Sequence, residues 1–207
     1  MVSRLRLLVG LGNPGRRYVA TRHNAGAWFV ERLARALALE FRSESRFASN
    51  VARGRTADGT DFLLALPQSY MNESGHAVAG LARFYRVPSP EMLIAHDELD
   101  LKPGSVKLKL DGGSAGHNGL KHIVEQLGNA DFWRLRIGIG HPRDADASEQ
   151  EVADYVLHPP RAEEKTMIDE AIARALAVWP QLVAGDPERA MLALHTRPRP
   201  PCDEDQA

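Results

Sequence analysis

The stretch from Leu7 to Gly26, which reads LLVGLGNPGRRYVATRHNAG, constrains the fold of this chain more than any other. A short apolar run ending at Gly10 predicts a buried β-strand, and a loop rich in Gly, Asn and Pro separates it from a helical pattern that begins near Ala25. That loop contains Asn13, Tyr18, His23 and Asn24. Open α/β sheets build their binding sites from such loops, at the carboxyl ends of inner strands. The stretch therefore predicts an α/β fold with a site beside its first strand.

Strand and helix patterns alternate along the rest of the chain, which argues against an all-α or all-β fold. Further strands are predicted at 47–53, 62–66, 92–95, 105–110 and 134–140, and helices at 25–39, 78–85, 120–127, 162–178 and 187–194. Because the first two of these strands read as a hairpin, some strand pairs must be antiparallel. We expect an α/β fold in which residues 1–195 form a single domain, with a mixed central β-sheet flanked by helices. The Pro-rich and acidic tail, residues 196–207, is expected to be disordered.

Composition excludes several classes of protein. The chain has 207 residues, of which 43% are hydrophobic and 26% charged, as in an ordinary globular domain. No window approaches the roughly 20 apolar residues of a membrane span, and the N-terminus lacks a signal-peptide core. The single cysteine, Cys202, permits neither an internal disulfide nor a thiolate metal cage. We therefore expect a cytoplasmic protein without a membrane partner.

The net charge of −1 conceals an alternation of basic and acidic blocks. Residues 1–60 carry 11 Lys and Arg against 4 Asp and Glu, and residues 102–143 carry 7 against 3. The segments 61–101 and 144–207 are acidic, with 2 against 6 and 6 against 14. If the two basic blocks fold onto one face, that face would suit a polyanion such as a nucleic acid.

The glycines at 10–15 match the dinucleotide fingerprint G-x-G-x-x-G. In that fingerprint the helix begins within the glycines, so that its free amides bind pyrophosphate. Here Pro14 removes one amide, the helical pattern waits until Ala25, and no second strand lies in range. We therefore expect no nicotinamide cofactor.

A second motif, Gly112 to Gly116, matches the G-x-S-x-G nucleophile elbow of serine hydrolases, with Ser114 as the nucleophile. That elbow follows a fully buried strand, whereas the strand pattern before Ser114 exposes Lys107 and Lys109. A glycine loop that allows close approach of the backbone is the favoured interpretation. A serine esterase remains an alternative.

The histidines do not have the spacing of a metal motif. His117 and His122 are five residues apart, so on a helix they point in different directions. Adjacent His96 and Asp97 point to opposite faces of a strand. We expect no metal site.

His23 is the candidate general base because of the residues that accompany it. Asn13, Asn72, Asp97 and Asn118 each lie at a predicted strand end or helix start, where sites of α/β proteins assemble. The imidazole would accept a proton, the carboxylate would hold its tautomer, and the amides would bind a carbonyl and water, which suits hydrolysis of an acyl group. The simpler role for Asn72 and Asn118 is as helix N-caps.

Five segments of the chain resemble the bacterial peptidyl-tRNA hydrolase family, and they occur in order over residues 5–195. They read VGLGNPGRRYVATRHNAG (9–26), LPQSYMNESG (66–75), HDELDLKPG (96–104), GGSAGHNGLKHI (112–123) and RLRIGIGHP (134–142). The glycine block departs slightly from the family pattern at Ser114-Ala115, which affects none of the proposed catalytic residues.

The resemblance implies a monomeric α/β enzyme without cofactor or metal. Its substrate would be peptidyl-tRNA, bound through the acceptor stem and 3′ end. It would cleave the ester between a nascent peptide and the tRNA 3′-ribose, and so recycle tRNA from abortive translation.

By position, the resemblance implies that the catalytic residues would be His23 as base, Asp97 as its partner, and Asn72 and Asn13 at the water, carbonyl and terminal adenosine. The substrate-binding residues would be Tyr18, Met71, Asn118, His117, Gly116, Lys107, Lys109 and Arg136, the last three at the tRNA 5′-phosphate. A serine esterase and a non-catalytic RNA-binding domain remain the alternatives.

Overall fold

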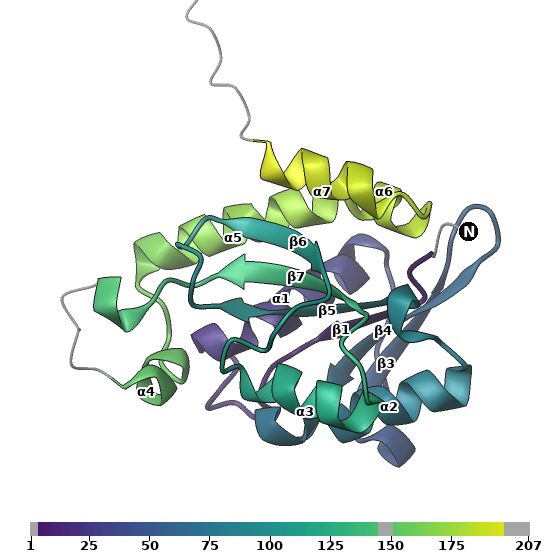
Figure 1. Ribbon diagram of the computed structural model, residues 1–207, viewed down its shortest axis with the longest axis horizontal. Helices are drawn as coiled ribbons and strands as arrows, with labels where there is room; N and C mark the ends of the chain where they lie inside the picture. The colour runs from purple at the N-terminus through teal and green to yellow at the C-terminus, as the bar shows by residue number, and fades with distance from the viewer. Residues whose placement is uncertain (1–3, 145–150, 197–207) are drawn as a thin grey trace, which may run out of the picture.

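A computed structural model describes residues 4–144 and 151–196 of the chain. Seven strands form one mixed sheet in the order β2-β3-β4-β1-β5-β7-β6 (Figure 1). The strands are β1 (Leu7–Gly10), β2 (Arg42–Glu44), β3 (Ser49–Arg55), β4 (Asp61–Pro67), β5 (Met92–Glu98), β6 (Val106–Leu110) and β7 (Trp133–Gly138). The four inner strands β4, β1, β5 and β7 are parallel, whereas β2, β3 and β6 add antiparallel pairs at the two edges. The predicted mixed sheet is confirmed.

Helices cover both faces of the sheet (Figure 1). The α-helices are α1 (Ala25–Ala36), α2 (Ser74–Tyr85), α3 (Asn118–Leu127), α4 (Val152–Val156), α5 (Ala162–Ala177), α6 (Trp179–Val183) and α7 (Pro187–His195). Short 3₁₀ helices are η1 (Arg22–Asn24), η2 (Ser45–Phe47), η3 (Met71–Glu73), η4 (Ser89–Glu91) and η5 (Pro142–Asp144). Helices α2 and α3 pack on one face, and α1, α5, α6 and α7 pack on the other. None of the helices in the described part of the chain has the length and apolar character needed to cross a membrane.

The sequence pattern of each strand explains its place in the sheet. Every residue of β1 and β5 is buried, because helices cover both faces of a central parallel strand. Strand β6 lies at the edge and alternates, with Val106 and Leu108 in the core and Lys107 and Lys109 exposed. The exposed face of β6 is therefore basic, as the period-two pattern predicts.

Several predicted boundaries were wrong because the backbone turns where the hydrophobic pattern continues. The first helix ends at Ala36 rather than residue 39, since Ala38 adopts a left-handed φ of 53°. The strand predicted from residue 47 begins at Ser49, since Ala48 is also left-handed, with φ 44°. The short polar strand β2 had no apolar signal and was not predicted.

The two asparagines considered as helix caps do not have that role. Asn72 lies inside η3, and the cap position of α2 is Glu73, without a side-chain hydrogen bond. The cap of α3 is His117, whose side chain accepts a hydrogen bond from the backbone N–H of Leu120, and Asn118 is the first helical residue. Apart from Thr196, the tail expected to be disordered lies outside the described residues.

Helix α1 packs very closely against the centre of the sheet at Gly26. A Cβ atom on Gly26 would lie 2.1 Å from the carbonyl oxygen of Ala95 on β5, and one on Gly10 would lie 2.6 Å from the carbonyl oxygen of Gly26. Real Cβ atoms do not approach backbone so closely, so these glycines set the distance between α1 and the sheet. Gly10, the first glycine of the motif, therefore serves helix–strand packing.

Gly26→Ala is expected to lower the free energy of unfolding by about 3 kcal/mol, because backbone on both sides must move to admit the methyl group. The matched control is Gly80→Ala in α2, where the new Cβ meets only the ring of Phe47, at 3.2 Å. That variant should stay within about 1 kcal/mol of wild type, since alanine also favours the helix. Denaturant titration measures both, and equal stability of the two variants would contradict the packing argument.

Candidate active site

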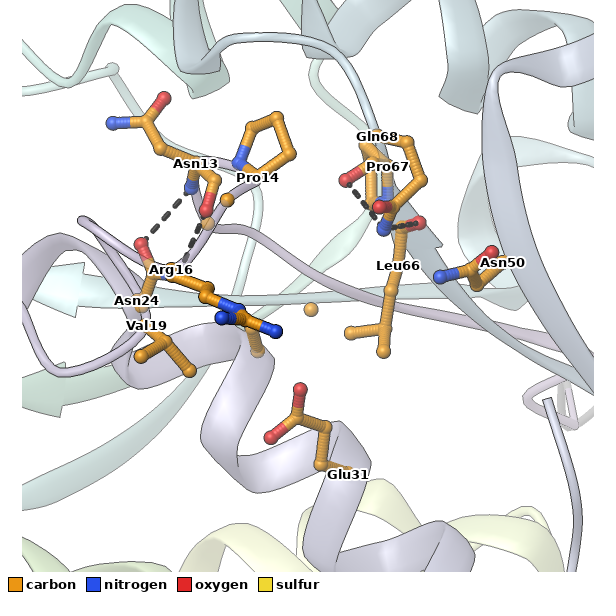
Figure 2. A pocket seen from close by; sticks show the side chains of 14 residues that line it. Asn13, Pro14, Arg16, Val19, Asn24, Glu31, Asn50, Leu66, Pro67 and Gln68 are labelled. Atoms are coloured by element: carbon orange, nitrogen blue, oxygen red, sulfur yellow. Dashed lines mark hydrogen bonds between the residues drawn. The ribbon is translucent and has the colours of Figure 1, made fainter. Parts of the chain in front are cut away.

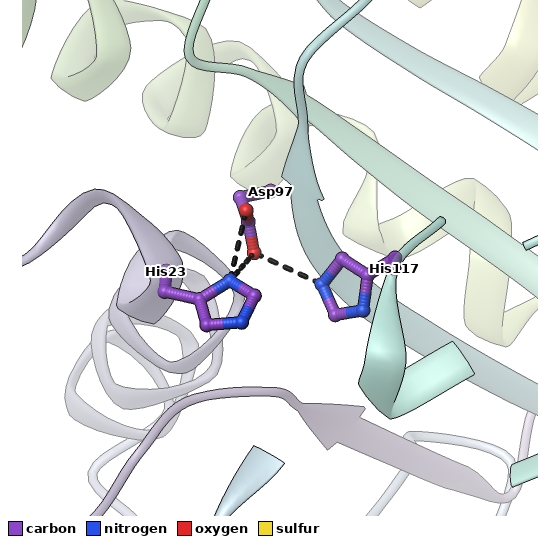
Figure 3. Close-up of side chains that lie close together, drawn as sticks. All are labelled: His23, Asp97 and His117. Carbon is purple, nitrogen blue, oxygen red and sulfur yellow. Dashed lines mark hydrogen bonds and ion pairs between the residues drawn. The ribbon is translucent and has the colours of Figure 1, made fainter. Parts of the chain in front are cut away.

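The carboxyl end of β5 places Asp97 between two histidines (Figure 3). The Nδ1 atom of His23, from η1, lies 2.9 and 3.0 Å from the two carboxylate oxygens of Asp97. On the other side, Nε2 of His117 lies 3.0 Å from Oδ1 of Asp97. The structure therefore brings together three predicted site residues. In the sequence, His23 lies 74 positions before Asp97, and His117 lies 20 positions after it.

The protonation of these groups follows from the burial of Asp97. Burial alone would raise the pKa of Asp97, but the charges and hydrogen bonds of His23 and His117 outweigh it and lower that pKa far below its usual value. Asp97 is thus a carboxylate, which only accepts hydrogen bonds, so both facing ring nitrogens carry hydrogen. For His117 this agrees with its Nδ1, which accepts from Leu120 N.

The neutral form of His23 consequently has its lone pair on Nε2. Burial alone would lower the pKa of His23, but the charge of Asp97 and its hydrogen bond raise the pKa above the usual 6.5. A histidine oriented through Nδ1 by a carboxylate, with Nε2 unprotonated, is arranged to accept a proton from water.

A cavity of about 450 Å³ lies beside this group. Its lining includes five predicted site residues: His23, Asp97, Gly116, His117 and Asn118. Helix α4 contributes Val152, Ala153 and Val156 to the lining. The cavity therefore combines a polar region around His23 and Asp97 with an apolar wall, as sites for organic substrates commonly do.

Asn13 is held rigidly beside this site by two neighbours. Its Oδ1 accepts a hydrogen bond of 2.8 Å from the backbone N–H of Met71. The side chain of Asn24 accepts from Asn13 N at 2.9 Å and donates to Asn13 O at 3.0 Å (Figure 2). With Oδ1 engaged, the Asn13 amide presents its NH₂ group as a hydrogen-bond donor.

A second cavity, of about 280 Å³, has Asn13 and Asn24 among its lining residues (Figure 2). Arg16, Glu31 and Gln68 contribute polar groups to it, and burial raises the pKa of Glu31. The side chain of Asn13 points away from this cavity (Figure 2). The Asn13 amide is thus not directed into it.

The predicted site residues Tyr18, Met71 and Asn72 differ in their burial and in the residues that they contact. Met71 is buried, and its sulfur lies 2.6 Å from the point where a Cβ on Gly119 would be, so its side chain packs against the start of α3. Tyr18 makes an edge-on contact with Tyr70, with ring centroids 6.3 Å apart. Asn72 is exposed and follows Met71 directly. Neither Tyr18, Met71 nor Asn72 lines either cavity.

The predicted cations meet on the face of β6 and β7. Lys107 lies directly opposite Arg136, and Lys109 lies opposite Arg134. The two lysines are exposed, whereas Arg136 Nε also donates to Glu98 Oε2 at 2.8 Å. Lys109, Arg134 and Arg136 border a cavity of about 290 Å³. The sheet thus assembles a cationic surface. Glu98 offsets part of its positive charge by pairing with Arg136.

Sequence reasoning missed the roles of Asn24, His96 and Arg134. Arg134 is buried and donates to the backbone carbonyls of Gly112 and Gly113, so it supports the glycine loop. Burial and the neighbouring His117 lower the pKa of His96 to about 3, and its ring packs against His117 at 5.1 Å. No local pattern signals such partners, because each lies in a distant segment.

The serine-esterase alternative lacks its catalytic contact. Across residues 4–144 and 151–196, the Ser114 hydroxyl forms no hydrogen bond with a histidine or a carboxylate, so it lacks the contact to a base that activates a serine nucleophile. The loop around it turns through left-handed residues, with φ 120° at Gly112, 47° at Ala115 and 80° at Gly116. The glycines of this motif therefore shape a loop.

The His23–Asp97–His117 group also has the chemical make-up of a metal site, since its ligand atoms all lie within 4.8 Å of one another. The nitrogen–oxygen distances of 2.9 to 3.0 Å are those of hydrogen bonds rather than of shared coordination. Hydrogen bonding alone explains how the three groups are arranged.

Comparison with known proteins shows the family of the chain. The family model described as peptidyl-tRNA hydrolase matches residues 7–201. The peptidyl-tRNA hydrolase of Nitrosospira multiformis is 54% identical over 193 residues, covering 93% of this chain and 98% of that protein. That of Azoarcus sp. is 54% identical over 195 residues, covering 94% and 86%.

Solved structures give the same result. The crystal structure of peptidyl-tRNA hydrolase from Acinetobacter baumannii superposes with a TM-score of 0.88, at 42% identity, and covers 95% of this chain and 97% of that one. A complex of peptidyl-tRNA hydrolase with n-propanol also gives 0.88. A match over nearly the whole length, at such identity, shows that the chain belongs to the peptidyl-tRNA hydrolase family.

Proposed function

We propose that this chain hydrolyses the ester between the peptide and the 3′-ribose of peptidyl-tRNA with a water molecule that His23 activates. The observation that carries the mechanism is the pair of contacts from His23 Nδ1 to the buried carboxylate of Asp97, at the wall of the 450 Å³ cavity. They orient the ring and leave Nε2 as the base.

In the first step, Nε2 of His23 accepts a proton from water as the water oxygen attacks the acyl carbon. The imidazolium that forms is stabilised by Asp97, which stays ionised. The charge that develops on the carbonyl oxygen needs a donor, and the NH₂ group of Asn13 is suited to that role. Asn72, next to Met71, and Asn118, in the cavity lining, are the further amides we assign to the water, the carbonyl and the terminal adenosine.

In the second step, the tetrahedral intermediate collapses and the bond from the acyl carbon to the ribose oxygen breaks. The proton on His23 passes to that oxygen, so the products are tRNA and the peptide carboxylic acid, which loses its proton to the solvent at neutral pH. An alcohol leaves more readily than an amine, so a single base suffices and no covalent nucleophile is required. We therefore propose action as a monomer without cofactor or metal. A substrate made in translation supports a cytoplasmic location.

We assign the cationic face of β6 and β7 to the acceptor stem of the tRNA. Lys107, Lys109 and Arg136 share one face of adjacent strands, and Arg136 reaches Glu98, one residue beyond Asp97. Double-stranded RNA is recognised chiefly through phosphates and shape, and a terminal phosphate offers a dianion to such a cluster. Tyr18, Met71, Gly116 and His117 complete the proposed substrate-binding set.

The proposed function is tested by release of free tRNA from N-acetyl-aminoacyl-tRNA in ¹⁸O-labelled water. Label should appear in the acyl carboxylate and not in the tRNA. His23→Ala should lower kcat by about 10² to 10⁴, the usual cost of losing a general base. His76→Ala, an exposed histidine on α2, is the control and should match wild type. If wild type releases no tRNA, the function is wrong; if His23→Ala keeps its rate, His23 is not the base.

The pH dependence of the rate should identify Asp97 as the partner of His23. Because Asp97 raises the pKa of His23, the acid limb of kcat/KM should have its midpoint above 6.5. Asp97→Asn removes the charge but leaves the burial that lowers this pKa, so the midpoint should move to lower pH, with a reduced plateau. A midpoint that does not move would show that the carboxylate does not act on the catalytic base.

Lys107→Ala with Lys109→Ala should raise KM for intact peptidyl-tRNA and leave kcat nearly unchanged, since phosphate contacts bind ground and transition states alike. The salt dependence of KM should become shallower, by roughly one unit or less of log-log slope for each lost contact. The control is a substrate without its 5′-phosphate, on which the double substitution should have little effect. Equal damage with both substrates would place the lysines elsewhere on the RNA.

A further inference from the structure

Arg22 precedes His23 in η1 and points to a different part of the molecule. Its side chain is almost fully buried, with 5% of the residue exposed. One guanidinium nitrogen, Nη1, lies within 3.0 to 3.3 Å of the carbonyl oxygens of Tyr155, His158 and Pro159. The backbone N–H of Arg22 also donates to His158 O, at 3.1 Å. A buried cation adjacent to the catalytic base thus binds the chain at the end of α4.

The other guanidinium nitrogen, Nη2, ties Arg22 to α5. It lies 2.8 Å from Glu164 Oε2, and the same oxygen accepts from the backbone N–H of Arg161 at the start of α5. The guanidinium also lies over the ring of Tyr155, 4.0 Å from its centroid. Arg22 therefore links η1, α4 and α5 at one point.

Helix α4 depends on such anchors for its position. It has only five residues, far fewer than a helix needs to be stable by itself. Besides the contacts to Arg22, it is held by the hydroxyl of Tyr155, which donates to Ile139 O at 2.8 Å. Of the carbonyls that Arg22 binds, that of Tyr155 lies in the last turn of α4 and those of His158 and Pro159 follow the helix, which is the end where a cation is favourable.

One side of α4 forms the apolar wall of the cavity beside His23. Val152, Ala153 and Val156 line that cavity together with His23 and His117. The distance from this wall to the catalytic base is set through the η1 backbone, because Arg22 and His23 are consecutive. We therefore expect a substitution of Arg22 to displace the wall more than it disturbs the contact between His23 and Asp97.

We propose that Arg22 is a positioning residue that fixes α4 as the wall against which the acyl group of the substrate binds. The proposal rests on the function proposed above. It assigns the acyl group to the cavity side lined by α4, and it assigns to Arg22 an effect on substrate binding rather than on proton transfer.

Lysine is the informative substitution at this position. The planar guanidinium reaches three carbonyls and a carboxylate and also stacks on Tyr155, whereas a single ammonium cannot do all of these at once. Arg22→Lys keeps the buried charge near Glu164, so it avoids leaving that carboxylate unpaired. The matched control is Arg32→Lys, because Arg32 of α1 also pairs with an acid of α5, Asp169, but forms no hydrogen bond or ion pair with the described residues of α4.

In steady-state assays with N-acetyl-aminoacyl-tRNA, Arg22→Lys should raise KM about tenfold, the factor expected for losing one charge-assisted hydrogen bond. kcat and the pH midpoint of kcat/KM should stay at wild-type values. Arg32→Lys should change neither constant. An unchanged KM in Arg22→Lys overturns the proposal. A fall in kcat with a shifted pH midpoint also overturns it, because Arg22 would then act on His23.

A double-mutant cycle distinguishes positioning of the wall from general stabilisation. Val152→Ala alone should raise KM, since Val152 is part of the wall. In the Arg22→Lys background the same change should add little, because the wall is already displaced. Fully additive effects on KM would show that Arg22 does not act through α4.

Glu164→Gln covers the case in which Arg22→Lys fails to fold. It removes one end of the link, while the glutamine oxygen can still accept from Arg161 N at the start of α5. A rise in KM smaller than that expected for Arg22→Lys, with kcat unchanged, supports the proposal, and no rise contradicts it. Absence of tRNA release by wild type would instead reject the proposed function itself.

Discussion

The buried carboxylate of Asp97 holds the site together because it accepts hydrogen bonds from two imidazoles at once. An isolated carboxylate in the protein interior would be strongly unfavourable, and here the N–H groups of His23 and His117 satisfy it. The same two bonds fix the tautomer of both rings. His96 donates from Nδ1 to the carbonyl oxygen of Asp97, at 2.7 Å, and its low pKa keeps it neutral, so it adds no positive charge beside the carboxylate. One buried charge thus determines which nitrogen of His23 can act as a base.

Asp97 reaches this position because β5 lies at the centre of the parallel part of the sheet. The strands on either side, β1 and β7, end at the same edge, and the loop after β1 returns to it as η1. The close approach of Gly26 to Ala95 lets α1 start directly against β5, which places His23 within hydrogen-bond distance of Asp97. Asn24, which follows His23 in the sequence, forms two hydrogen bonds with the backbone of Asn13 in the same loop.

The alternation of basic and acidic blocks has a structural explanation. On the face of the sheet that α2 and α3 cover, the β6 and β7 edge carries alternating cations, including Lys107 and Arg136. Acidic residues of the C-terminal third form ion pairs across the opposite layer, such as Glu164 with Arg22 and Asp169 with Arg32. Part of the acidic charge therefore fastens α5 to the N-terminal half, while the lysines of β6 remain available to an anionic partner.

The sequence alone determined the architecture and selected His23 and Asp97 as the proposed catalytic pair. Buried runs such as β5 and the alternation of Val106 to Leu110 specify central and edge strands, because hydrophobic periodicity is a local property of the chain. His23 and Asp97 could be selected because each follows a strand or glycine loop at the edge where α/β sites form. Their separation, and the orientation of His23 through Nδ1, depend on packing between segments 74 positions apart.

Only the tertiary structure decided which polar residues act as caps, which serve as supports and which line the cavity. Asn72 looked like the cap of α2, but a turn of 3₁₀ helix shifts the start of that helix to Ser74. Asn118 looked like the cap of α3, but the glycine loop turns His117 inward, and His117 caps that helix. Arg22 shows no sequence signal of its partners, since they are backbone carbonyls more than 130 residues away. A backbone carbonyl has no sequence signature, so contacts to it appear only when the chain is folded.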